Sequence, residues 1–214
     1  MDTWYQPPTK AGFLELVLNM LSLPLVLASS SPRRRALLSE SGYSFTVEEP
    51  HPTAEDEPRD GETPEEVVGR LAYQKGAEVA ARIGRGLVLA CDTVADLDGQ
   101  ILGKPDDLAH ARRMLTSLRG RDHHVHSGVC LWPVPQGSPV VRVATTTLHM
   151  APLSDEQLEE YLASGLWQGK AGSFGYQDRH GWLEIKSGSE SNVVGLPLEL
   201  LSEMLNQLDI SVLK

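Results

Sequence analysis

Short apolar runs alternate with capped helical segments along most of this chain. Residues 25–28 form the first apolar run, and the three serines and Pro32 that follow predict a helix with Ser31 as its N-cap. The run 87–90 follows a second helix, which opens with the capping box of residues 63–66. This alternation is typical of parallel strands joined by helices.

The second half of the chain has a different pattern. Residues 125–132 and 140–150 read as two long antiparallel strands around a Pro/Gly loop, and helices are expected at 107–118, 154–163 and 198–208. Asp98-Gly99 predicts a hairpin turn, and the stretch 171–197 reads as Gly-rich with short strands. We therefore expect an α/β fold with a mixed sheet flanked by helices.

Composition limits the class of protein. With 214 residues, 41% apolar and 22% charged, the chain has the size and apolar content of one globular domain. Its net charge of −10 argues against binding to nucleic acid or to an anionic membrane. Two cysteines, Cys91 and Cys130, form no disulfide framework, which favours a reducing, cytoplasmic location.

An apolar segment near the N-terminus resembles a signal peptide. It lacks a basic region in front, and Glu15 and Asn19 interrupt it. We therefore expect residues 1–22 to be an N-terminal extension, with Met20 as an alternative start, and residues 23–214 to form a single catalytic domain. No other segment is long and apolar enough to span a membrane.

The helix that begins after Ser31 carries Arg33, Arg34 and Arg35 in its first turn. Free N–H groups and the helix dipole favour anions there, so three cations in this turn are unfavourable without a negative partner. A bound triphosphate would resolve the conflict. The alternative is three solvated arginines.

Three more charged residues are candidates for phosphate chemistry. Asp92 follows an apolar run that we expect to end at Ala90, where a carboxylate can serve as a general base or a Mg²⁺ ligand. Lys104 follows a glycine, and Lys75 continues the apolar stripe of its helix. The alternatives are that Asp92 caps a turn, that Lys104 is an ordinary surface lysine, and that Lys75 snorkels to the solvent.

Two other features are less specific. The glycines of residues 172–177 and 188–197 suit backbone contact with a flat ligand such as a base, or simply tight turns. Among His123, His124 and His126, the last two would share one face of a strand and could bind a metal, although an exposed strand start is the more common outcome. Cys91 has no base placed beside it by sequence, which argues against a nucleophile.

Taken in order along the chain, five segments resemble those of the Maf family of nucleoside triphosphate pyrophosphatases. They are LASSSPRR (27–34), LAYQKG (71–76), CDTVADLDGQILGKP (91–105), GKAGSFGYQ (169–177) and SNVVGLPLELL (191–201). The resemblance implies a fold related to the inosine triphosphate pyrophosphatases, a cytoplasmic homodimer, and hydrolysis of a nucleoside triphosphate to monophosphate and pyrophosphate. It also implies a divalent metal cation, Mg²⁺ or Mn²⁺.

The resemblance assigns roles to particular residues. It implies that Ser29, Arg33 and Arg34 belong to a phosphate-binding loop. Lys75 and Lys104 correspond to the two lysines that embrace the triphosphate, and Asp92 corresponds to the general base, which also binds the metal. The metal-site glutamate of the family corresponds best to Glu55, with Glu57 second, because the loop differs in length from the usual pattern.

The resemblance also bears on base preference. Arg33, Thr93 and Gln177 match the branch that takes dTTP and UTP, whereas Ser173-Phe174 looks more like the branch that prefers 7-methyl-GTP. We expect dTTP and UTP as substrates. The alternatives are 7-methyl-GTP or another non-canonical nucleotide, and a nucleotide-binding regulator of cell division that needs no turnover.

Overall fold

A computed structural model of the chain describes residues 23–56, 59–135, 137–176, 181–208, 210 and 212. The predicted extension 1–22, Glu57 and Gln177 lie outside the described residues. No helix within the described ranges has the length and hydropathy needed to cross a membrane.

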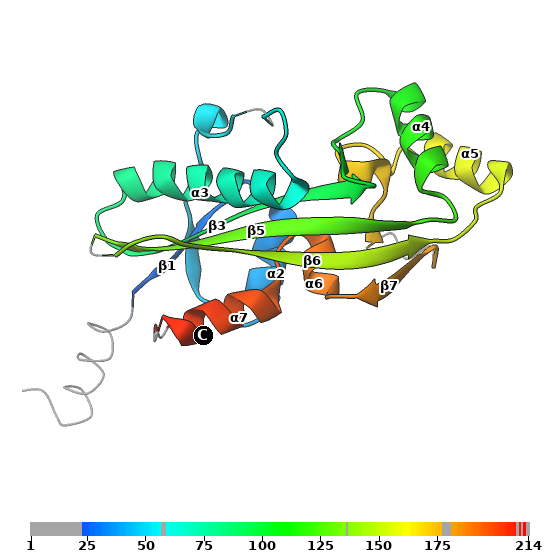
Figure 1. Cartoon of the computed structure of the whole chain (residues 1–214). Coiled ribbons are helices and arrows are strands. Elements are labelled where there is room, and N and C mark those ends of the chain that lie inside the picture. Colours follow the sequence, from blue (N-terminus) through cyan, green and yellow to red (C-terminus); the bar gives the residue numbers. More distant parts are fainter. Residues whose placement is uncertain are drawn as a thin grey trace, which may run out of the picture.

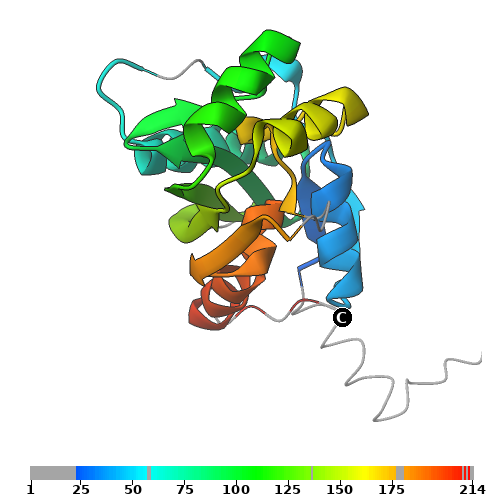
Figure 2. The same cartoon turned by 90° about the vertical axis from the view of Figure 1, so that its right-hand side faces the viewer.

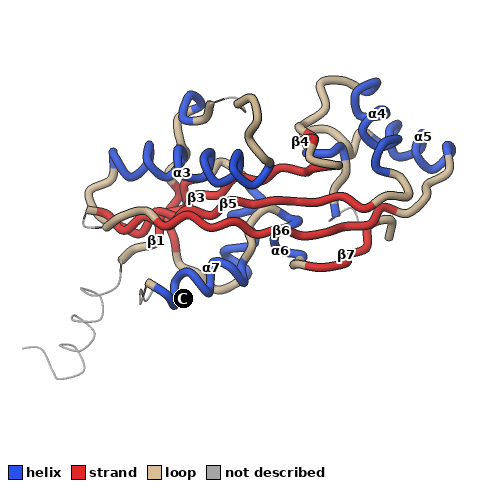
Figure 3. The backbone as a smooth tube through the Cα atoms, in the orientation of Figure 1, coloured by secondary structure: helices blue, strands red, loops and turns tan. Residues whose placement is uncertain are grey.

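Strands in the described residues form one mixed sheet in the order β2-β1-β3-β5-β6-β7, with β4 paired to β3 (Figure 3). The strands are β1 (Leu25–Ala28), β2 (Phe45–Val47), β3 (Gly86–Leu97), β4 (Gln100–Leu102), β5 (Asp122–Val134), β6 (Val140–Met150) and β7 (Leu183–Ser187). The pairs β1–β2 and β1–β3 are parallel, and the pairs from β3 to β7 are antiparallel. The predicted α/β fold with antiparallel edges is therefore confirmed.

Helices cover both faces of this sheet. They are α2 (Pro32–Glu40), α3 (Pro64–Arg82), α4 (Leu108–Leu118), α5 (Asp155–Ser164), α6 (Glu190–Val194) and α7 (Leu198–Gln207), with short 3-10 helices η1 (Pro52–Ala54) and η2 (Ala171–Ser173). Helix α3 lies on one face, α2, α6 and α7 lie on the other, and α4 and α5 pack at one end (Figures 1 and 2). The predicted cap at Ser31 and the capping box that begins at Thr63 are both present.

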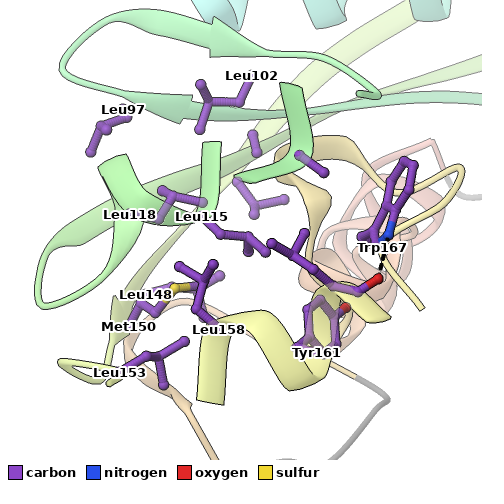
Figure 4. Close-up of a cluster of buried hydrophobic side chains, with 14 residues drawn as sticks. Leu97, Leu102, Leu115, Leu118, Leu148, Met150, Leu153, Leu158, Tyr161 and Trp167 are labelled. Carbon is purple, nitrogen blue, oxygen red and sulfur yellow. Dashed lines mark hydrogen bonds between the residues drawn. The ribbon is translucent and has the colours of Figure 1, made fainter. Parts of the chain in front are cut away.

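Alternation of side chains along β3 divides the core. Val88 and Ala90 pack with residues of α3, whereas Leu87 and Leu89 pack with residues of α2 and α7. A third cluster lies under α4 and α5, where the indole Nε1 of Trp167 donates to a backbone carbonyl at 3.0 Å (Figure 4). Each fully buried leucine of this core stabilises the fold by about 1.5–3 kcal/mol relative to an exposed leucine.

The extent of β3 differs from the prediction. We expected the strand to end at Ala90, but it continues to Leu97 because β5 pairs along almost its whole length. Its parallel neighbour β1 ends at Ala28, opposite Ala90, and β4 pairs only from Ala95 onwards. Among the described strands, none pairs with residues 91–94 on this side, so one edge of β3 is open there.

Two local predictions have different outcomes. The Asp98-Gly99 hairpin is present, with φ of 55° and 82°. The stretch 171–197 holds one strand, β7, together with the unexpected helix α6. The first three residues of α6 are polar and the helix has only five residues, so its sequence carries no apolar period that would indicate a helix.

Candidate active site

A cavity of about 890 Å³ lies at the open edge of β3, which is enough for a ligand of nucleotide size. Its lining comes from the start of α2, the η1 loop, α3, β3 and the segments around η2 and α6. Eight candidate residues line this one cavity: Ser29, Arg33, Arg34, Glu55, Lys75, Asp92, Thr93 and Lys104. Gln177 lies outside the described residues, and its neighbour Tyr176 is part of the lining.

The serine loop after β1 orients the start of α2. The Ser31 side chain accepts from the Arg34 backbone N–H at 3.4 Å, and the Ser31 N–H donates to Ser29 Oγ at 3.1 Å. These contacts fix the turn that leads from β1 into the helix. Since the first turn of a helix presents free N–H groups, this end of the cavity suits an anion.

Arg34 is held by three neutral acceptors. Its Nε donates to the Gly195 carbonyl at 2.7 Å, Nη2 to Thr93 Oγ1 at 3.1 Å and Nη1 to Ser29 Oγ at 3.4 Å. Among the described residues, no carboxylate lies within ion-pair distance of Arg34. The guanidinium is therefore fixed in position while its charge stays available to an anion.

Gly195 connects three parts of the site through its carbonyl, whereas the sequence suggested only backbone contact with a flat ligand or a tight turn. Its carbonyl also accepts from Thr93 Oγ1 at 3.3 Å and from Cys91 Sγ at 3.3 Å. Thr93 Oγ1 lies 2.8 Å from Ser127 Oγ as well. A glycine at the end of a short helix looks like an ordinary C-cap in sequence, so no local signal could have identified these contacts.

Lys75 meets two carboxylates inside the cavity. Its Nζ lies 2.5 Å from Asp92 Oδ1 and 3.1 Å from Glu55 Oε2. Lys75 and Asp92 are each only 8% exposed. The sequence left open whether Lys75 snorkels or pairs with an anion, and in the structure it pairs.

Two cations stay exposed at the cavity. In the described part of the chain, Arg33 and Lys104 have no carboxylate within ion-pair distance. Arg35 does not line the cavity and pairs with Glu49 at 2.8 Å, so two of the three arginines of this turn contribute. The described lining holds five lysines and arginines against three carboxylates, which makes a local basic pocket in a chain of net charge −10.

The other end of the cavity is apolar and aromatic. Phe174 lines it and packs at a tilt against Tyr161 and Trp182, with ring centroids 4.9 and 5.7 Å away. Gly172 and Gly175 are also part of the lining. One end therefore suits phosphates, and the other suits a flat ring.

His123 is part of the lining of this cavity, whereas His124 and His126 are not. Burial lowers the pKa of His123 to about 4, and its Nδ1 is buried without a partner in the described structure. His124 and His126 share a strand face with Asp96, as the alternation predicts for this pair. Burial raises the pKa of the Cys91 thiol, which disfavours a nucleophile.

The residues present fit the divalent cation that the resemblance implies. Oxygens of Asp92 and Glu55 both lie within 3.1 Å of the single Lys75 Nζ, so two carboxylates from distant parts of the chain converge on one point. Carboxylate oxygens are the ligands that Mg²⁺ and Mn²⁺ prefer.

An α/β domain with a cationic cavity beside converging carboxylates defines a protein that binds a polyanion. The family model described as Maf-like protein matches residues 24–208, and the chain belongs to the Maf family.

Relatives of named activity match most of the chain. A dTTP/UTP pyrophosphatase of Rhodopirellula baltica is 53% identical over 86% of this chain and 82% of that protein. A dTTP/UTP pyrophosphatase of Dictyoglomus thermophilum is 39% identical over 88% of this chain and 98% of that protein. Among solved structures, a HAM1 protein from Coxiella burnetii is 17% identical with a TM-score of 0.47, over 86% of this chain and 99% of that one.

Proposed function

We propose that this chain is a nucleoside triphosphate pyrophosphatase that hydrolyses dTTP and UTP to the nucleoside monophosphate and diphosphate. The observation that carries the proposal is a single cavity in which unpaired cations face two converging carboxylates. The named activity of relatives up to 53% identical supports the same reaction and the same bases.

Charge neutralisation is the main requirement for phosphoryl chemistry. Arg33, Arg34 and Lys104 supply positive charge along the cavity, and we assign them to the triphosphate together with Ser29. Arg34 needs no reorientation to do this, because Ser29, Thr93 and Gly195 already hold it.

Asp92 is our candidate for the general base. It would accept a proton from the water whose oxygen attacks the α-phosphorus, while the bond from that phosphorus to the bridging oxygen breaks and diphosphate leaves. Lys75 holds the Asp92 carboxylate in place at 2.5 Å. Asp92 and Glu55 are the ligands that we assign to a divalent cation, which when bound supplies further neutralisation of phosphate charge.

Base selection is assigned to Arg33, Thr93 and Gln177. An amide such as that of Gln177 can donate to and accept from a pyrimidine edge. The contact of Thr93 Oγ1 with Arg34 at 3.1 Å supports an additional positioning role for this hydroxyl. Phe174 and its aromatic neighbours offer a surface for the base.

The test is a substrate panel of dTTP, UTP, CTP, GTP, ATP, inosine triphosphate and 7-methyl-GTP with Mg²⁺ or Mn²⁺. Pyrophosphate and orthophosphate are assayed separately. We expect monophosphate and pyrophosphate from dTTP and UTP. The same products mainly from 7-methyl-GTP would keep the reaction but refute the base preference, and binding without turnover would favour a regulator of cell division.

The role of Asp92 has its own variant. Asp92→Asn should lower turnover by about 10²-fold if the carboxylate is the base. Asp155→Asn, on the exposed first turn of α5, is the matched control and should leave turnover unchanged. Equal turnover in both variants would remove Asp92 from this role.

The resemblance also implies a cytoplasmic homodimer, and we include both in the proposal. Light scattering coupled to gel filtration should give twice the mass of the chain. A mass of one chain at micromolar concentration would contradict the dimer.

A further inference from the structure

Three metal-ligating side chains meet on the face of the sheet where α3 packs. Asp96 of β3 lies directly opposite His124 of β5, and His126 is two residues further along β5, so all three share one face. Each offers a ligand atom, and these atoms all lie within 4.8 Å of one another. None of the three belongs to the described lining of the nucleotide cavity.

The Asp96 carboxyl group is buried. The residue is only 3% exposed, and both carboxylate oxygens accept from the Gly99 N–H, at 2.9 and 3.0 Å. Over the described ranges of the chain, no lysine or arginine pairs with it. A buried carboxylate without a cation is costly, and a metal ion on its remaining lone pairs would offset that cost.

His126 is already oriented as a ligand. It is 3% exposed, and its Nδ1 lies 2.9 Å from Thr145 Oγ1 and 3.3 Å from Glu65 Oε1, in the first turn of α3. These partners occupy Nδ1 and leave Nε2 for a metal. A carboxylate on the far nitrogen is the usual way in which proteins fix a metal-bound imidazole.

We propose that Asp96, His124 and His126 bind one Zn²⁺ ion, at a site separate from the nucleotide cavity. Two imidazoles and one carboxylate are ligands that suit Zn²⁺, whereas the all-oxygen pair Asp92 and Glu55 suits Mg²⁺. Ligands at about 2.0–2.2 Å in a tetrahedron lie roughly 3.3 Å apart, so modest side-chain rotations would close the site around the ion. Water would take the remaining position.

The site would act on the structure of β3. Asp92 and Asp96 lie on the same face of this strand, roughly 13 Å apart at four residues of about 3.3 Å each. Because β3 has an open edge at residues 91–94, an ion that ties Asp96 to β5 would stabilise the strand that carries the candidate base. Its effect is expected on stability, whatever nucleotide the cavity accepts.

The experiment titrates Zn²⁺ into chelator-treated full-length protein without nucleotide, by calorimetry. We expect one Zn²⁺ per chain, a Zn²⁺-dependent rise in Tm, and shifts of the His124 and His126 imidazole signals in NMR spectra. His124→Gln should weaken binding by more than about tenfold and remove the rise in Tm. His110→Asn, on α4, is the matched control and should do neither.

A second variant separates this site from the cavity. The double substitution Glu55→Gln and Asp92→Asn removes the two cavity carboxylates that we assign to the divalent cation and should leave Zn²⁺ binding intact. Loss of binding in this variant, or unchanged binding in His124→Gln, would overturn the proposal. So would absence of Zn²⁺ binding to the wild-type protein, since the three side chains would then only lie close together without an ion. The imidazole shifts of the wild-type protein decide the matter if His124→Gln fails to fold.

Discussion

Replacing Lys75 by methionine would leave two carboxylates of the cavity without their shared cation. Lys75 Nζ lies 2.5 Å from Asp92 Oδ1, and the Asp92 side chain is 12% exposed. Removing one partner of a buried ion pair costs about 3–5 kcal/mol. The Glu55 side chain is 41% exposed, so its ion pair with Lys75 contributes only about 0–1 kcal/mol, as is typical of surface ion pairs. We expect Lys75→Met to lower the free energy of unfolding by about 3 kcal/mol, at the low end of the buried range.

Urea unfolding followed by circular dichroism at pH 7 measures this loss, in a chelator and again in Mg²⁺. Part of the loss should return in Mg²⁺, because removal of the ammonium group strengthens the binding of a cation to Asp92 and Glu55. Lys104→Met is the matched control: Lys104 is exposed and has no carboxylate partner in the described structure, so its unfolding free energy should change by less than about 0.5 kcal/mol. Equal midpoints for Lys75→Met and the wild type in the chelator would refute the reasoning.

Two further predictions concern the fold around the site. In Gly128→Ala, the new Cβ would lie only 2.1 Å from the Val68 carbonyl oxygen of α3, so the helix must shift. We expect the free energy of unfolding to fall by about 3 kcal/mol or more. The matched control is Gly84→Ala, whose new Cβ meets nothing within 4 Å. Thermal melts should give a lower Tm for Gly128→Ala than for Gly84→Ala, and equal Tm values would show that α3 can move at no cost in stability. Burial lowers the pKa of His123 from 6.5 to about 4. Between these two pH values the unfolded state therefore binds more protons than the folded state. The free energy of unfolding should fall as the pH drops from 6.5 to 4, by up to about 1.4 kcal/mol per pH unit. His123→Gln should flatten this part of the urea-derived stability profile between pH 6.5 and 4, and identical slopes would contradict the assignment.

Local sequence signals predicted the elements that open the site. Ser31 caps α2 and Thr63 begins the capping box of α3, because both signals depend only on residues a few positions apart. The apolar stripe of its helix marked Lys75 as a core-facing lysine but left open whether it snorkels or pairs with an anion. The assignment of Glu55 to the metal site rested on the family resemblance, since the loop before α3 has no periodic pattern, and its contact with Lys75 was not predicted.

Long-range pairing was beyond local reasoning. The end of β3 was predicted wrongly because the partner strand β5, more than 30 positions later, decides how far the strand runs. The contact of Asp96 with His124 depends on that same register. Arg34 meets Gly195 across 161 positions of sequence, and neither residue carries a signal for the other. The roles assigned to Glu55 and Gln177 stay predictions.

The Gly195 carbonyl also determines when the site can assemble during synthesis. It is the acceptor for Arg34, Cys91 and Thr93, which a ribosome makes far earlier than residue 195. Until α6 is made, the guanidinium of Arg34 lacks its shortest hydrogen bond, and the rim of the cavity formed by residues 193–195 does not exist. Nascent chains that stop short of this segment can build the parallel strands and α3, but they cannot hold Arg34 in its final orientation.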